Sequence, residues 1–160
     1  MHARSAPRQI EVLLEEREWR RAAPDIAAQI RRAAGLTLGR AGRAAVPLTV
    51  LLTNDERLRA LNRTHRGKGK PTNVLSFPAA PGSDYLGDIA IAFGVARQEA
   101  EAAGKPLAHH AVHLAVHGVL HLLGYDHANA REAEAMEALE TEILAEIGIP
   151  DPYRRRGCAA

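Results

Sequence analysis

The stretch from His117 to His127, HGVLHLLGYDH, contains three histidines at spacings of four and six residues. Two histidines four residues apart lie on one face of an α-helix, one turn above the other. If the helix continued, His127 would point about 120° away from that face. Gly124 can instead adopt the left-handed conformation that ends helices, so that His127 turns back to the same point. The spacing therefore predicts a tripod of imidazoles around a metal ion, with the open fourth position of catalytic zinc sites.

Other histidines precede the tripod in the apolar segment 106–123. A purely structural cluster would need a partner for every ring, because an unpaired buried polar group costs about 1–3 kcal/mol. His113, one turn before the tripod, could support a ligand or pack in the core. For His109 and His110 we expect structural or surface roles. Asp126 could orient a ligand or help to begin the last helix.

The residue after the first histidine of the tripod decides against one type of chemistry. The pattern His-x3-His-x2-Gly-x2-His is the spacing of the metzincin zinc proteases, which carry a glutamate at that position as the general base. Here the position is Gly118, which cannot accept a proton. Hydrolysis of peptides by that route is therefore not expected.

A second group of functional side chains lies in the segment LNRTHRGKGKPTNVLSFP, residues 61–78. Four cations fall within eight residues: Arg63, Arg66, Lys68 and Lys70. Such a run is often only a solvated loop, but an arginine can hold phosphate oxygens in bidentate fashion. Because three neutral imidazoles leave a divalent metal with its full charge, a nearby arginine would make the cleft suit an anion better than a peptide.

Alternating and apolar periodicities predict the elements that position these groups. We expect strands at residues 9–16, 45–54, 73–77 and 88–93, and helices at residues 24–35, 55–65, 94–105, 106–123 and 129–148. Gly35 and Gly104 would end two of the helices, and Asn54 would cap another. The order of strands and helices indicates a mixed α+β domain.

The composition is that of an ordinary globular domain, with 46% hydrophobic and 25% charged residues among 160. We expect one domain over residues 1–150 and a flexible tail over residues 151–160. The 21 basic and 19 acidic residues nearly balance, so overall charge does not indicate a nucleic-acid binder. A single cysteine, Cys158, and the lack of an apolar span favour a cytoplasmic protein without membrane contact.

Three segments in this order, LNRTHRGKGKPTNVLSFP, YLGDIAIAF and HGVLHLLGYDH preceded by HLAV, resemble the YbeY family of bacterial endoribonucleases. The resemblance covers residues from about 50 to 147. It implies a zincin-like fold, in which a small mixed four-stranded sheet packs against about five helices and the metal-binding helix is central. It also implies one Zn²⁺ held by His117, His121 and His127, and Arg66 as the catalytic cation. The family often carries aspartate where this chain has Gly69.

The resemblance further implies a role in ribosomal RNA maturation, at the 3′ end of 16S rRNA, and in ribosome quality control. The expected activity is metal-dependent hydrolysis of single-stranded RNA by a monomer. The expected partners are ribosomal RNA, the small ribosomal subunit and ribosome-associated proteins. Two alternatives remain open: a zinc peptidase built on the same tripod, and a non-catalytic ribosome-assembly factor in which zinc only stabilises the fold. The basic YRRRG segment near the C-terminus could contact RNA or remain solvated.

Overall fold

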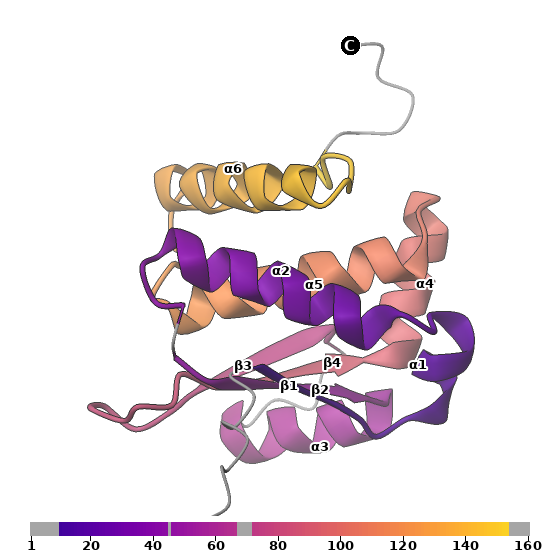
Figure 1. The fold of residues 1–160 in the computed structure, drawn as a ribbon. Coiled ribbons are helices and arrows are strands. Elements are labelled where there is room, and N and C mark those ends of the chain that lie inside the picture. The colour runs from indigo at the N-terminus through magenta and orange to yellow at the C-terminus, as the bar shows by residue number, and fades with distance from the viewer. Residues whose placement is uncertain (1–9, 45, 67–71, 154–160) are drawn as a thin grey trace, which may run out of the picture.

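The chain folds into stacked layers around one four-stranded sheet. The computed structural model describes residues 10–44, 46–66 and 72–153, apart from the side chains of His65 and Arg66. Figure 1 shows α2 (Ile26–Arg40) and α5 (Leu107–Leu122) on one face of the sheet, with α6 (Ala130–Glu146) stacked beyond them. α3 (Asp55–Arg66) covers the opposite face. The remaining helices are α1 (Arg17–Ala22) and α4 (Phe93–Ala103).

The sheet has the strand order β1-β2-β4-β3 and is mixed. β1 (Ile10–Leu14), β2 (Leu48–Thr53) and β4 (Gly87–Ala92) run parallel, and β3 (Val74–Pro78) pairs antiparallel with β4. The inner strands β2 and β4 are buried over most of their length, as expected for strands covered by helices on both faces. This confirms the predicted fold class of a mixed α+β domain with a four-stranded sheet.

The apolar helix α5 is the centre of the core. Ten of its sixteen residues are buried, and it packs against α2, α4, α6, β3 and β4. Its neighbours on the sheet include Ile89 and Ile91, which are fully buried. The predicted position of the histidine-bearing helix at the centre of the fold is therefore confirmed.

No helix in the described residues is both long and apolar enough to cross a membrane.

Three details of the secondary structure differ from the sequence-based expectations. α2 does not end at Gly35 but continues to Arg40, because Thr37 and Leu38 beyond the glycine are buried and anchor the last turns in the core. A short helix, α1, was not anticipated; it buries Trp19, whose indole Nε1 donates to the carbonyl of Thr53 at 2.9 Å. The described residues therefore contain six helices rather than about five.

Other predicted helix boundaries agree with the structure. Gly104 ends α4 in the left-handed conformation, with φ of 66°. Asn54 caps α3 by accepting a hydrogen bond from the backbone N–H of Arg57 at 2.8 Å. Pro106 stands immediately before α5, where its missing N–H is not needed. These boundaries fix where α5 starts and hence the register of its histidines.

Candidate metal centre

Close packing of α5 on the sheet explains why position 118 is a glycine. A Cβ at Gly118 would lie 2.9 Å from a methyl carbon of Ile89 on β4, closer than real side chains come. The carbonyl of Gly118 also accepts a hydrogen bond from the hydroxyl of Ser76 on β3, at 3.2 Å. The residue that would carry the base in a metzincin therefore faces the sheet in this chain. Gly118 brings the helix close to the sheet and has no side chain to offer to chemistry.

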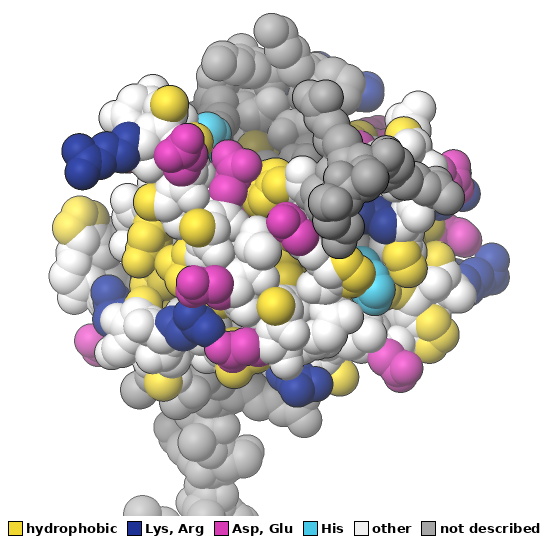
Figure 2. Space-filling view, turned by 90° about the horizontal axis from the view of Figure 1, so that it is seen from above, with side chains coloured by type: hydrophobic (Ala, Val, Ile, Leu, Met, Phe, Trp, Pro, Cys, Tyr) yellow, Lys and Arg dark blue, Asp and Glu magenta, His cyan; other side chains and the backbone are white. Residues whose placement is uncertain are grey.

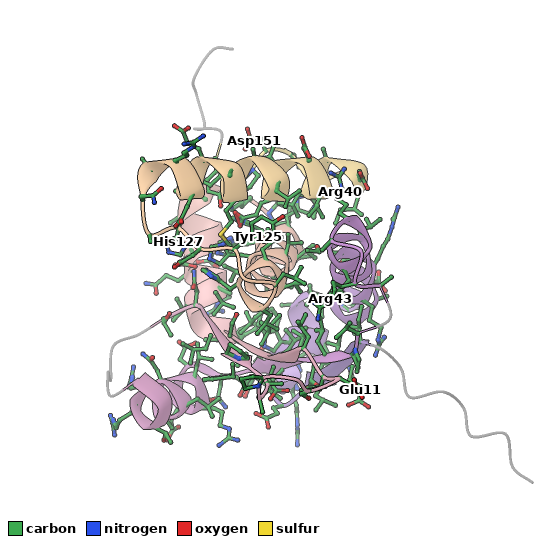
Figure 3. All side chains as sticks on the ribbon, turned by 90° about the vertical axis from the view of Figure 1, so that its left-hand side faces the viewer. Glu11, Arg40, Arg43, Tyr125, His127 and Asp151 are labelled. Carbon is green, nitrogen blue, oxygen red and sulfur yellow. The ribbon has the colours of Figure 1, made fainter. Side chains whose placement is uncertain are left out.

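The structure brings His117, His121 and His127 together, as the spacing predicted. One possible ligand atom from each lies within 4.8 Å of the other two. Gly124 follows α5 with φ of 101°, a conformation that side chains rarely adopt, and the chain turns back there. Figure 3 shows Tyr125 and His127 in the segment that joins α5 to α6. His117 and His121 are partly buried and His127 is exposed, so one side of the tripod is open to solvent.

Hydrogen bonds fix the orientation of two of the three rings. The Nδ1 of His117 lies 2.8 Å from the Oε1 of Glu140, and the Nδ1 of His121 lies 3.1 Å from the carbonyl of Tyr125. Both partners are acceptors, so both Nδ1 atoms carry the proton. Both Nε2 atoms then present lone pairs, and they are only 3.0 Å apart. Two lone pairs at this distance repel each other unless a cation lies between them, so the donor set fits a metal ion.

Glu140 on α6 is the most buried charged residue of the site, with no exposed surface. Burial raises the pKa of its carboxyl group, but hydrogen bonds from His113, His117 and Tyr153 lower that pKa to about 2. Glu140 is therefore ionised at neutral pH. A carboxylate that accepts the second N–H of a metal-binding histidine fixes the ring and raises its basicity.

His113 and Tyr153 complete the contacts of this carboxylate. The Nε2 of His113 lies 3.1 Å from Glu140 Oε1, and the hydroxyl of Tyr153 donates to Glu140 Oε2 at 2.6 Å. His113 thus supports the carboxylate that holds His117, rather than His117 directly. Burial and the bond to Glu140 raise the pKa of Tyr153, which keeps its hydroxyl protonated as a donor. Tyr153 belongs to the segment that we expected to be a tail.

Electrostatics favours the metal-binding form of His121 as well. Burial, followed by the neighbouring imidazoles of His117 and His127, lowers the pKa of His121. A lower pKa favours the neutral imidazole, which is the form that binds a metal. The tripod is therefore prepared for a cation by both its hydrogen bonds and its burial.

The remaining side chains singled out in the sequence occupy different places. His110 is buried, and its Nε2 lies 2.8 Å from Glu99 Oε1, whereas His109 is partly exposed. Asp126 accepts a hydrogen bond from the backbone N–H of His127 at 2.7 Å. Asp126 does not begin α6, because Asn129 is the residue that caps this helix.

The basic loop lies largely outside the described residues. Arg66 is the last residue of α3, but its side chain is not described, and residues 67–71, with Lys68, Gly69 and Lys70, are not described at all. The assignment of Arg66 as the catalytic cation therefore stays a prediction. The boundaries of the domain and of the tail also stay predictions.

Glu140 and Tyr153 are the parts of the site that sequence reasoning missed. Glu140 lies 23 residues after His117, in a helix with five other glutamates. Its one distinguishing signal is its position: in the pattern of apolar residues on α6, Glu140 falls on the side of Met136, Ile143 and Leu144, which face the core. A glutamate on the apolar face of a helix indicates a buried partner.

Comparisons with known proteins agree with this architecture. A solution structure of the Thermotoga maritima protein TM1509 matches with a TM-score of 0.55 and 23% identity, over 91% of this chain and 99% of that one. This likeness shows the fold. A curated relative named "Endoribonuclease YbeY" from Bradyrhizobium diazoefficiens is 50% identical, over 91% of this chain and 85% of the relative.

Other curated relatives carry the same name. One from Paracoccus denitrificans is 45% identical, over 92% of this chain and 91% of the relative. One from Rhodopseudomonas palustris is 57% identical, but the match spans 66% of this chain and only 60% of the length of that relative. The sequence model of the family described as "Endoribonuclease YbeY" matches residues 8–148. The chain therefore belongs to the YbeY family, as shown by this match and by the two relatives that are matched over most of their length.

Proposed function

We propose that this chain is a zinc-dependent endoribonuclease, which hydrolyses phosphodiester bonds of single-stranded RNA during ribosomal RNA maturation and ribosome quality control. The observation that carries the proposal is the tripod, in which the Nε2 atoms of His117 and His121 face each other at 3.0 Å while their Nδ1 atoms are held by acceptors. The name shared by the curated relatives supports RNA as the substrate.

Zinc is the metal that best suits three imidazoles with an open fourth position. Bound there, it would activate water and polarise a phosphoryl oxygen. His117, His121 and His127 would hold the ion, and Glu140 would keep His117 in place. Arg66, at the end of α3, would grip the phosphate through its guanidinium group and offset the negative charge of the transition state.

The distribution of charge supports approach of RNA from one side only. Besides the buried Glu140, α6 carries five glutamates and one arginine, and two of the five are paired with Arg40 of α2. Figure 2 shows acidic side chains on this side of the molecule. Such a face repels phosphates. The RNA would therefore reach the tripod from the side of α4 and the start of β3. We expect ribosomal RNA in the small ribosomal subunit to be the partner, and a cytoplasmic monomer to be the active form.

The test compares His121→Ala and Arg66→Ala proteins with the wild type on single-stranded ribosomal RNA containing the 3′ end of 16S rRNA, with zinc added. We expect cleavage by the wild type, loss of zinc and of cleavage in His121→Ala, and loss of cleavage with zinc retained in Arg66→Ala. Equal cleavage by all three proteins would indicate a contaminating nuclease and refute the proposal.

The peptidase alternative has one structural observation in its favour. Glu137 lines a cavity of about 240 Å³ together with His117 and His127, so a carboxylate is present near the tripod. A peptidase would cleave casein in a chelator-sensitive manner and leave RNA intact. The assembly-factor alternative predicts that Arg66→Ala weakens binding to the small subunit although the wild type has no turnover. Assays of the wild type, His121→Ala and Arg66→Ala on RNA, on casein and for binding to the small subunit therefore distinguish the three functions.

A further inference from the structure

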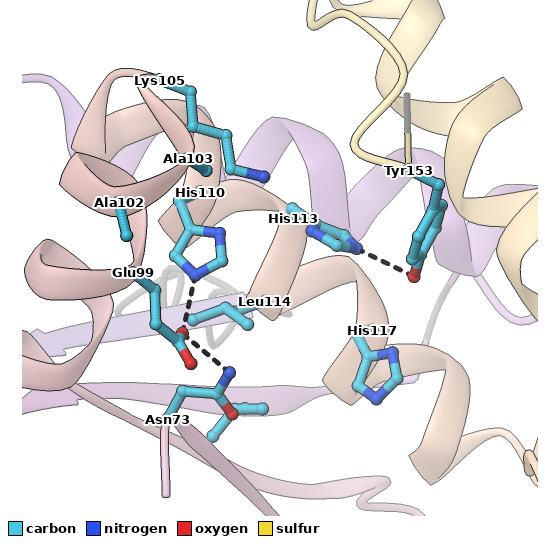
Figure 4. A pocket seen from close by; sticks show the side chains of 11 residues that line it. Asn73, Glu99, Ala102, Ala103, Lys105, His110, His113, Leu114, His117 and Tyr153 are labelled. Carbon is cyan, nitrogen blue, oxygen red and sulfur yellow. Dashed lines mark hydrogen bonds and ion pairs between the residues drawn. The ribbon is translucent and has the colours of Figure 1, made fainter. Parts of the chain in front are cut away.

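A pocket of about 570 Å³ adjoins the metal centre and shares His117 with the tripod. It lies between α4, α5 and the start of β3, where Asn73 and Val74 line it, and Figure 4 shows it from close by. Along α5 its wall runs from His117 through His113 to His110, with ring centroids 6.5 and 6.2 Å apart. The three rings connect the tripod with the far end of the pocket.

The polar groups at the far end are held in fixed positions. Glu99 Oε1 accepts a hydrogen bond from the Nδ2 of Asn73 at 3.0 Å, and lies 2.8 Å from the Nε2 of His110. Both bonds end on the same oxygen (Figure 4). Within the part of the chain that the structure describes, both hydrogen bonds of the Glu99 carboxylate are made by Oε1, and 42% of the side chain is exposed, which leaves Oε2 accessible to a ligand. The buried Nδ1 of His110 has no hydrogen-bond partner among the described residues.

The lining of this pocket suits an uncharged, flat ligand. Lys105 brings one positive charge and Glu99 one negative charge. Because the two charges cancel, the pocket offers a phosphate group little electrostatic attraction. Val74, Ala102 and Leu114 provide apolar walls, on which the faces of a ring can pack. A second metal ion fits less well, because among the described residues only the tripod gathers three ligand atoms.

We propose that this pocket binds an unstacked nucleobase of the RNA strand that carries both an amino group and a carbonyl group, which means cytosine or guanine. The inference rests on the proposed function. The amino group would donate to Oε2 of Glu99, as carboxylates accept from cytosine N4, and the carbonyl would accept from Lys105. Proteins that read single-stranded RNA recognise splayed bases in this way. From His110 to His117 α5 rises about 10 Å, which places the base close to the scissile phosphate.

The test measures binding of CMP, GMP, AMP and UMP to the metal-free protein, so that no hydrolysis is needed. Since adenine lacks the carbonyl and uracil lacks the amino group, we expect CMP, GMP or both to bind about tenfold more tightly than AMP and UMP. Whichever of the two binds identifies the base. Equal affinity for all four nucleotides would overturn the proposal.

Glu99→Gln makes the test specific. The amide oxygen can keep the bonds to Asn73 and His110, while an NH₂ donor replaces the accepting Oε2. We expect the preference to move to UMP, whose two carbonyls match two donors, whereas damage to the fold would weaken all four nucleotides alike. Glu101→Gln, on the same helix but exposed, should leave all four affinities unchanged. An unaltered preference in a folded Glu99→Gln protein would refute the role of Glu99.

Lys105→Gln provides a second variant, which removes the charged donor. We expect its affinity for CMP and GMP to fall about tenfold, to the level of AMP. The nucleotide-binding results test the pocket separately from the proposed nuclease function. A zinc-loaded protein that cleaves RNA but binds all nucleotides equally would refute only the pocket, and base-selective binding without cleavage would refute only the nuclease.

Discussion

Glu140→Gln removes the charge that holds His117 while nearly preserving the shape of the side chain. The carboxylate is fully buried and accepts hydrogen bonds from the rings of His113 and His117 and the hydroxyl of Tyr153. Glutamine keeps one oxygen for these donors and presents an NH₂ group to the others. His117 therefore loses a charged acceptor for its Nδ1–H, and its Nε2 becomes a weaker ligand.

Loss of a hydrogen-bonded partner behind a metal ligand lowers metal affinity about 10–100-fold. That range corresponds to about 1.4–2.7 kcal/mol of binding free energy. We expect a decrease in zinc affinity of this size, measured by competition with a chromophoric chelator at pH 7. Glu134→Gln is the matched control, because Glu134 lies on the same helix but is exposed. It should bind zinc as the wild type does.

Two results would refute this reasoning. A folded Glu140→Gln protein with wild-type zinc affinity would show that Glu140 does not act on the metal site. An equal loss of affinity in Glu134→Gln would show that the general charge of α6, and not the bond to His117, determines binding. Far-UV circular dichroism of the metal-free proteins checks that each variant is folded.

Two further predictions concern stability. Gly118→Ala should lower the free energy of unfolding by about 1–3 kcal/mol in urea titrations, because the new Cβ would lie 2.9 Å from Ile89. A Cβ at Gly39 in α2 would meet no atom within 4 Å, so Gly39→Ala should instead raise the free energy of unfolding by about 0.4–1 kcal/mol. Burial lowers the pKa of His110 in the folded protein below its ordinary 6.5. As the pH falls, the imidazole of His110 is therefore protonated in the unfolded chain before it is protonated in the folded one, which favours unfolding. The stability of the metal-free protein should therefore fall as pH drops below about 6.5, and less steeply in His110→Gln.

Each of these stability predictions has a clear contrary result. Equal stabilities of the two glycine variants would mean that Ile89 yields without cost and that α5 is not closely packed on β4. A pH profile unchanged by His110→Gln would show that other groups determine the loss of stability in acid. A rise in stability below pH 6.5 would contradict the sign of the effect.

The sequence predicted the parts of the site whose determinants are local. Two histidines one turn apart and a glycine three residues after the second define the tripod within eleven residues. The helical period and the conformational freedom of Gly124 are enough to bring them together. The helix boundaries at Asn54 and Gly104 were predictable for the same reason, since capping depends on immediate neighbours.

The parts that escaped prediction depend on distant residues. Glu140 reaches His117 because α6 packs on α5, and Tyr153 reaches Glu140 only after the chain has passed the end of α6. α2 continues through Gly35 because residues beyond it are buried, which no local rule reveals. Gly118 was interpreted from the sequence as a missing base, whereas its contact with Ile89 gives it a packing role. In each case tertiary packing outweighed the local pattern.

The central claim is that a single metal ion in the tripod makes this chain a nuclease. The most direct test is to add zinc in steps to the metal-free protein and measure the rate of cleavage of single-stranded ribosomal RNA. We predict no cleavage without metal and a rate that rises in proportion to zinc until one equivalent per chain. Cleavage that is independent of zinc, or no cleavage by a chain that has bound one equivalent, would contradict the claim.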